Sequence, residues 1–193
     1  MLTDRDKKLL RWIENYKAIT IQQATVLFFN NLDVSARRRL NQLQEAGLIK
    51  SYTRKLTKEK VYYQEKKKSN HDLYIYDFIK VIKKEGYNLR KLILSPRFLD
   101  GKIIPDAYLE IRKGNEILTL LLEVDSSHYT SHSKMQMYEM LYKSGEVQEQ
   151  AYGVFPSLVI ARPSLNDIRY NSRNFRVVYT SLSFDNLNKL LLL

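Results

Sequence analysis

Residues 33–49, DVSARRRLNQLQEAGLI, decide the fold of the first third of the chain. Gly47 lies where a helix commonly ends in a left-handed backbone conformation, and Asp33 or Ser35 is a candidate N-cap. The spacing of the apolar residues predicts a helix that ends at Ala46 and packs with one face on its neighbours. Those apolar residues are Ala36, Leu40, Leu43 and Ala46.

The other face of this helix carries polar side chains of the types that contact DNA. In the major groove arginine pairs with guanine, and asparagine or glutamine pairs with adenine. In DNA-binding helices of the helix-turn-helix type, the side chains near the N-terminus of the helix contact the base edges. The polar side chains of this helix lie at the same end. Arg39 could point either way along the rim. The candidate DNA-binding residues are Ser35, Arg37, Arg38, Arg39, Asn41 and Gln42.

The flanking residues predict two more helices and a hairpin. Thr3 with Asp6 is typical of a capping box, and Thr20 can cap a second helix that ends at Phe29. Residues 48–64, LIKSYTRKLTKEKVYYQ, read as two strands around a charged tip. The basic side chains of the hairpin are expected against phosphates or in the minor groove. They are Arg54, Lys55, Lys58 and Lys60.

Positive charge is concentrated in the same region. The chain has a formal net charge of +11, and residues 34–68 hold eleven Lys and Arg against three Asp and Glu. A local basic surface is typical of a protein that binds nucleic acid. The order of helices and basic hairpin resembles the winged helix-turn-helix superfamily, which implies a domain over residues 1–64 that binds duplex DNA. An adaptor that contacts only protein remains the alternative.

Residues 65–70, EKKKSN, form a polar break and the expected linker. The remainder, 71–193, predicts an α/β domain with a central mixed sheet, so that the whole chain is an α+β or α/β protein of two domains. Helices are expected over residues 71–84, 131–145, 164–172 and 184–193. Strands are expected within 91–95, 101–112, 116–126, 157–163 and 175–181.

Acidic side chains stand at the ends of two neighbouring strands in this part. Asp106 follows a proline, and Glu123 and Asp125 face the same side because side chains alternate along a strand. The order of elements is similar to that of the PD-(D/E)XK nuclease fold. That resemblance implies that Asp106 and Glu123 hold a magnesium ion against the scissile phosphate.

Asp125 departs from the nuclease pattern, in which a lysine takes the third position. A carboxylate offers no positive charge to a phosphate, although Lys134 on the next helix could supply one or Asp125 could be a further metal ligand. Asp106 could also simply begin a strand and Asp125 cap the following turn. We expect a nuclease-like domain that is catalytically inactive and has no cofactor. The alternative is a magnesium-dependent endonuclease that uses Asp106, Glu123, Asp125 and Lys134.

Residues 103–111, IIPDAYLEI, and 120–141, LLLEVDSSHYTSHSKMQMYEML, resemble the replication-relaxation family of plasmids and mobile elements. The matching features are a Pro-Asp strand, a Glu-x-Asp strand and a helix with a tyrosine, here Tyr138. The family often has an Arg-Gly turn after the acidic strand, where this chain has Ser126, Ser127 and His128. The resemblance implies a duplex-DNA-binding accessory or regulator of replication, mobilisation or transcription. An adaptor that recruits a relaxase or a replication protein is a further alternative.

Other features exclude several classes of protein. The chain has no cysteine, which excludes disulfide bonds and thiolate zinc sites. The N-terminus carries charges where a signal peptide needs an apolar stretch, and the apolar runs are too short to span a bilayer. We expect a bacterial cytoplasmic protein associated with the nucleoid or a plasmid. Since winged-helix proteins commonly bind DNA as pairs, we also expect a homodimer.

Overall fold

A computed structural model gives the fold of residues 1–55, 57–166 and 170–187. The chain divides into two compact units, Met1–Lys84 and Glu85–Leu193, and each is described by itself. The sequence predicts the division at residues 65–70, but helix 70–84 groups with the first unit. Two contacts explain this: the Tyr76 hydroxyl donates to the carbonyl of Tyr16, and the Gln23 side chain donates to Asp77.

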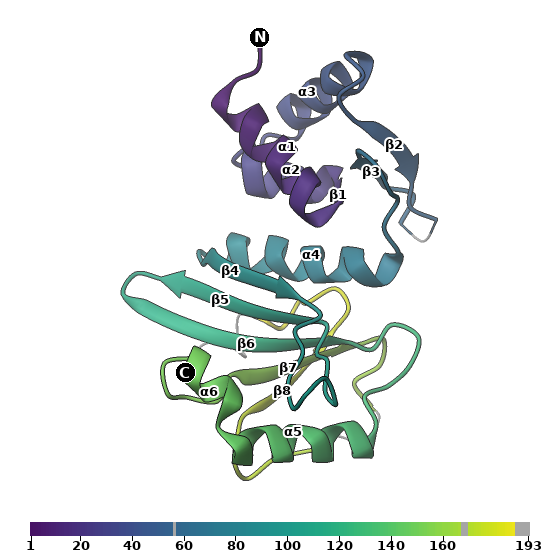
Figure 1. The fold of residues 1–193 in the computed structure, drawn as a ribbon. Coiled ribbons are helices and arrows are strands. Elements are labelled where there is room, and N and C mark those ends of the chain that lie inside the picture. Colours follow the sequence, from purple (N-terminus) through teal and green to yellow (C-terminus); the bar gives the residue numbers. More distant parts are fainter. Residues whose placement is uncertain (56, 167–169, 188–193) are drawn as a thin grey trace. The chain divides into compact units, whose positions relative to one another are not determined.

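The first unit contains helices and a small antiparallel sheet with the strand order β1-β3-β2 (Figure 1). Its core joins the helices to this sheet, with Leu9, Leu40 and Tyr62 among its buried side chains. The elements in chain order are α1 (Asp4–Tyr16), β1 (Ala18–Thr20), α2 (Ile21–Phe28), α3 (Asp33–Glu45), β2 (Lys50–Thr53), β3 (Lys60–Tyr63) and α4 (Asn70–Lys84).

Capping contacts set the starts of these helices, with one departure from the sequence. Thr3 forms the predicted capping box, and Thr20 caps α2 as predicted, in a second capping box with Gln23 that was not predicted. Helix α3 has Leu32 as its N-cap without a side-chain hydrogen bond, so neither Asp33 nor Ser35 is the cap. Asp33 lies in the first turn instead, where its carboxylate accepts a hydrogen bond from the arginine one turn later. Gly47 has a φ of +72°, as expected after the end of this helix.

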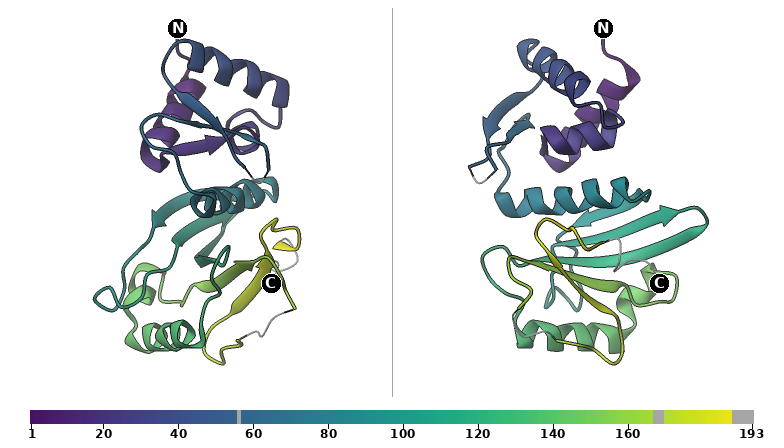
Figure 2. Two further views of the ribbon diagram at one scale, coloured as in Figure 1. Left: turned by 90° about the vertical axis from the view of Figure 1, so that its right-hand side faces the viewer. Right: turned by 180° about the vertical axis from the view of Figure 1, so that it is seen from behind.

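The second unit is built on a mixed sheet with the strand order β4-β5-β6-β7-β8. Strands β4, β5 and β6 are antiparallel, and β6, β7 and β8 are parallel. Helix α5 lies across one face of this sheet (Figure 2), where Tyr138 and Leu141 pack with Leu121. The elements are β4 (Asn88–Leu94), β5 (Ala107–Lys113), β6 (Glu116–Val124), α5 (His132–Ser144), α6 (Glu146–Gln150), β7 (Ser157–Arg162) and β8 (Val177–Ser181).

Most predicted elements of this unit are present, and the differences are local. Helix α6 was not expected from the sequence. The predicted helix over 164–172 is absent from residues 164–166 and 170–172, and its centre lies outside the described residues. Most of the predicted helix over 184–193 also lies outside them. Within the described ranges, no helix is both long and apolar enough to cross a membrane.

An ion pair between buried Asp6 and Arg39 ties α1 to α3. Arg39 donates from Nε to Asp6 Oδ1 over 2.9 Å and from Nη2 to Oδ2 over 2.6 Å. Asp6 also accepts from both the backbone and the hydroxyl of Thr3. Burial alone would raise the pKa of Asp6, but the hydrogen bonds from Arg39 and Thr3 outweigh it and lower the pKa from 3.8 to about 2. The carboxylate therefore stabilises the fold only while it is charged.

We expect Asp6→Asn to lower the free energy of unfolding by about 2 kcal/mol at pH 7, through loss of the charged cap and ion pair. Because the folded pKa of Asp6 is below its ordinary value, its contribution is present above pH 4 and is lost as the pH falls towards 2. Urea unfolding followed by Trp12 fluorescence, at pH 7 and at pH 2.5, measures this. Asp4→Asn, at an exposed acid in the same turn, is the control. A deficit for Asp6→Asn that is equal at both pH values contradicts the assignment.

Candidate functional site

Exposed cations lie on α3 and on the turn between β2 and β3. Arg38, Lys55 and Lys58 are exposed, and their side chains have no hydrogen bond or ion pair with any described residue. Arg37 is also on the surface: its Nε lies 2.6 Å from Asp33 Oδ2, and its side chain is 59% exposed. Neither Arg37 nor Arg38 folds inward, so this surface offers positive charge to a ligand.

Hydrogen bonds join helix α3 to the hairpin. The Asn41 Oδ1 atom accepts from Lys60 Nζ and from the Tyr62 hydroxyl, each over 3.2 Å. Gln42, also exposed, accepts from Arg39 Nη1 over 3.0 Å, and Ser35 is half-buried. The outer face of α3 and the stem of the hairpin therefore lie side by side. The expected DNA-binding residues of the two elements share one surface, except for two arginines.

Arg39 and Arg54 are placed differently from the sequence prediction. Arg39 is held by buried Asp6, as described above. The Arg54 side chain is 2% exposed, with Nη1 2.9 Å from Asp77 Oδ2 and Nε 3.1 Å from Asn70 Oδ1. Arg54 follows β2 directly and its guanidinium reaches α4, because a buried carboxylate there compensates the charge. Arg54 is therefore not available to a phosphate in this arrangement, and the partly exposed Arg39 is engaged by its ion pair with Asp6.

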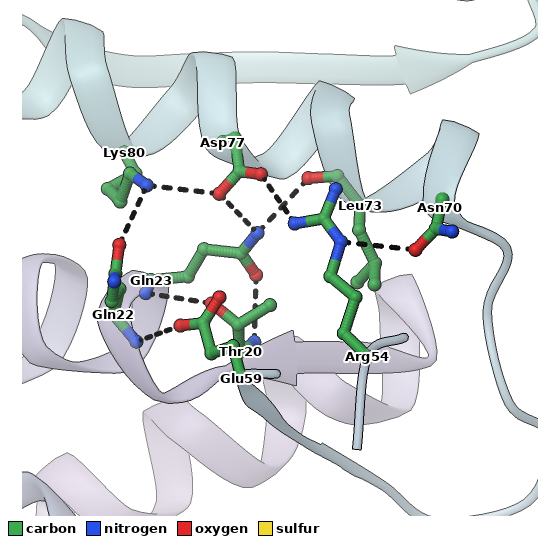
Figure 3. Close-up of polar contacts among 9 residues, drawn as sticks. All are labelled: Thr20, Gln22, Gln23, Arg54, Glu59, Asn70, Leu73, Asp77 and Lys80. Atoms are coloured by element: carbon green, nitrogen blue, oxygen red, sulfur yellow. Dashed lines mark hydrogen bonds and ion pairs between the residues drawn. The ribbon is translucent and has the colours of Figure 1, made fainter. Parts of the chain in front are cut away.

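Figure 3 shows Asp77 at the centre of a polar network formed by α2, α4 and the hairpin. Its Oδ1 atom accepts from Gln23 Nε2 over 3.0 Å and from Lys80 Nζ over 3.1 Å. Sequence reasoning missed this cluster, because Asp77 was assigned to the other domain. The run LYIYDFIKVI contains one acid among apolar residues, and a buried acid requires a partner. An acid within an apolar helical run therefore indicates a buried polar cluster of this kind.

In the second unit, Asp106 and Glu123 come together as expected. The Asp106 backbone N–H donates to the Leu122 carbonyl, and Asp106 Oδ2 accepts from the Val124 N–H over 2.7 Å. Lys134 also reaches this place, with its Nζ 2.6 Å from Glu123 Oε1 and 2.7 Å from Oε2. The Tyr138 hydroxyl donates to Glu123 Oε1. Both oxygens of this buried carboxylate therefore have a donor.

Asp125 is bound separately from Glu123. Its Oδ1 accepts from the Thr130 hydroxyl over 2.7 Å, and its Oδ2 lies 2.9 Å from Arg162 Nη2. Asp125 and Arg162 are both buried, and the guanidinium stacks on the Tyr179 ring, 4.7 Å from its centroid. The bond to Thr130 is the turn-capping contact that the sequence left open as an alternative for Asp125.

The carboxylates do not fit a magnesium site in this arrangement. Among the residues that the structure describes, no group of three or more His, Cys, Asp or Glu side chains could hold a metal ion. A metal bound by Asp106 and Glu123 would compete with the Lys134 ammonium for the Glu123 oxygens. Magnesium also prefers several oxygen ligands in octahedral geometry, whereas here the oxygens of Glu123 and Asp125 are paired with cations and hydroxyls.

Comparison of the chain with protein-family models, with curated proteins and with solved structures found no match. What the two clusters do must therefore follow from their own chemistry. The first combines exposed positive charge with polar side chains on a helix. The second is an internal set of ion pairs at the ends of β6 and β7.

Burial raises the pKa of Glu123 from 4.5 to about 7, and the neighbouring Asp106 adds to this, against the opposing effect of Lys134. Because the folded pKa is raised, the resulting stabilisation is full below pH 4.5 and is lost as the pH rises through 7. We expect wild type to lose up to about 3 kcal/mol of stability relative to Glu123→Gln between pH 4.5 and pH 8.

Urea unfolding followed by circular dichroism at several pH values measures this difference. Glu116→Gln, at an exposed glutamate at the other end of β6, is the matched control and should follow wild type. A constant difference between wild type and Glu123→Gln across this range would show that Glu123 does not take up a proton there.

Proposed function

We propose that the first unit is a winged helix-turn-helix domain that binds duplex DNA. The observation that carries the proposal is the exposed cation set on α3 and the hairpin. Arg39 and Arg54 form ion pairs with buried aspartates. Arg38, Lys55 and Lys58 are exposed and form no ion pair with any described side chain. DNA phosphates would pair with these side chains.

The order of the elements supports this proposal. The first unit runs helix, strand, helix, helix and hairpin before it ends with α4, and the sheet pairs β1 with the hairpin strand β3. In a winged helix-turn-helix the third helix enters the major groove and the hairpin lies against the backbone. Arg37, Arg38, Asn41 and Gln42 would then face base edges or nearby phosphates. Lys55, Lys58 and Lys60 would contact the flanking backbone.

We further propose that the protein is an accessory or regulatory protein of a plasmid or mobile element, in replication, mobilisation or transcription. The resemblance to the replication-relaxation family supports this role. The second unit would then be a nuclease-like domain without nuclease activity, which agrees with the ion pairs that occupy Glu123 and Asp125. Pairing of two copies on DNA belongs to the same proposal, whereas an adaptor that recruits a relaxase or a replication protein is the alternative to it.

Titration of a labelled duplex at rising salt concentration tests the binding proposal. We expect Lys58→Ala to weaken binding to all sequences alike and to reduce the salt slope by about 0.9 per lost phosphate contact. Arg38→Ala should cost about 1–3 kcal/mol on the preferred sequence and reduce the preference. Lys102→Ala, at an exposed lysine of the second unit, is the control. Wild-type affinity that is indifferent to salt contradicts the proposal.

Incubation of supercoiled plasmid with magnesium or manganese tests the nuclease alternative. We expect the plasmid to remain supercoiled, because Lys134 and Tyr138 occupy the oxygens of Glu123. Asp106→Ala is the matched variant that separates this protein from a contaminating nuclease. Cleavage by wild type that disappears in Asp106→Ala would establish the enzyme instead.

A further inference from the structure

We propose that α4 is part of the DNA-binding unit and that Asp77 is a positioning residue, which holds the β2–β3 hairpin in place for DNA. This inference rests on the proposed function, and it assigns a role to residues that are themselves buried. Asp77 lies on α4, outside the three helices and hairpin of the winged arrangement. Its partners, however, include the residue that begins the turn of the hairpin.

Arg54 controls the shape of that turn. Its backbone N–H donates to the Glu59 carbonyl over 2.8 Å, and its carbonyl accepts from the Lys58 N–H over 2.9 Å. These two bonds close the loop that carries Lys55 and Lys58. Because the Arg54 side chain is bonded to Asp77 and Asn70 on α4, the position of α4 sets the position of both exposed lysines.

The turn has a second attachment on α2. Glu59 Oε1 accepts from the Gln22 backbone N–H over 2.8 Å, in the first turn of that helix. The neighbouring Gln23 side chain donates to Asp77 Oδ1 and to the Leu73 carbonyl of α4 over 3.1 Å. The start of α2, the hairpin turn and α4 are thus joined in one network (Figure 3). Asp77 is the acceptor that all three elements share.

The burial of the pair makes this attachment strong. The Arg54 side chain is 2% exposed and that of Asp77 is 12% exposed. Removing one partner of a buried ion pair leaves the other charge without compensation, which is strongly destabilising. Without the carboxylate, the guanidinium of Arg54 would regain compensation for its charge by moving into water. Such a movement would displace the turn and with it Lys55 and Lys58.

Because Asp77 is negatively charged, a positioning role and simple electrostatics predict opposite effects of Asp77→Asn on DNA affinity. Asp77→Asn removes a negative charge, and simple electrostatics therefore predicts equal or tighter binding to DNA. A positioning role predicts the opposite, because the cations of the hairpin would no longer lie along the phosphates. Asp72→Asn provides the matched control: it removes the same charge from the first turn of the same helix, where the carboxylate bonds Ser69 and Lys68 and not the hairpin.

The experiment is a duplex titration with the full chain, at one salt concentration, for wild type, Asp77→Asn and Asp72→Asn. We expect binding by Asp77→Asn to be about tenfold weaker, from loss of about one well-placed phosphate contact, and binding by Asp72→Asn to lie within twofold of wild type. Equal or tighter binding by Asp77→Asn would overturn the proposal. Circular dichroism and Trp12 fluorescence report whether each variant is folded.

Arg54→Lys decides the question if Asp77→Asn fails to fold. A lysine keeps the positive charge but cannot bond Asp77 and Asn70 together, since it lacks the guanidinium fork. A positioning role predicts weaker binding by Arg54→Lys, whereas a direct phosphate contact by residue 54 predicts nearly unchanged binding. Unchanged binding overturns the proposal.

Hydrogen exchange separates this inference from the proposed function. If wild type does not bind duplex DNA, the proposed function fails. The effect of Asp77 on the stability of the hairpin turn can still be measured. We expect the hydrogen-bonded amides of Arg54 and Lys58 to exchange at least tenfold faster in Asp77→Asn or Arg54→Lys than in wild type, and Asp72→Asn to match wild type. Unchanged exchange in these residues overturns the positioning role whatever the outcome with DNA.

Discussion

The buried pair of Asp77 and Arg54 is the constraint on which the first unit depends. A buried guanidinium must have a carboxylate, and this carboxylate must come from α4, which the chain reaches only after the hairpin is complete. If α4 were separated from the elements before it, the charge of Arg54 would lose the carboxylate that compensates it. Together with the Tyr76–Tyr16 and Gln23–Asp77 hydrogen bonds, this pair ties α4 to the first unit, which ends at residue 84.

The basic region around α3 is not a uniform surface for an anionic ligand. Asp6 and Asp77 each hold one of its arginines: Arg39 connects α3 to α1, and Arg54 connects the hairpin to α4. The remaining cations are solvent-exposed on the outer side of α3 and at the tip of the hairpin. A net charge counts both groups equally, although only the second can exchange its counterions for phosphates. The arrangement separates charges that build the unit from charges that would bind.

The second unit uses its charged residues in a similar way. Lys134 comes from α5 to Glu123, and Arg162 comes from β7 to Asp125. Each pair closes a contact between an element that follows β6 and the end of β6 itself. Carboxylates at the end of a strand can thus serve to fasten a helix and a neighbouring strand to a sheet. The proximity of the carboxylates does not distinguish a metal site from a set of ion pairs. The groups that contact the carboxylate oxygens do distinguish them.

Local pattern determined most of the elements of this protein. The capping residues Thr3 and Thr20, the turn at Gly47 and the strand order from Asp106 to Glu123 follow from short-range spacing, which the sequence contains in full. The partners of Arg39 and Arg54 do not follow from it, because Asp6 and Asp77 lie 33 and 23 residues away along the chain. Exposure of an arginine depends on whether a distant carboxylate is brought to it. Only the tertiary structure decides that, since burial and charge compensation arise when separate elements pack together.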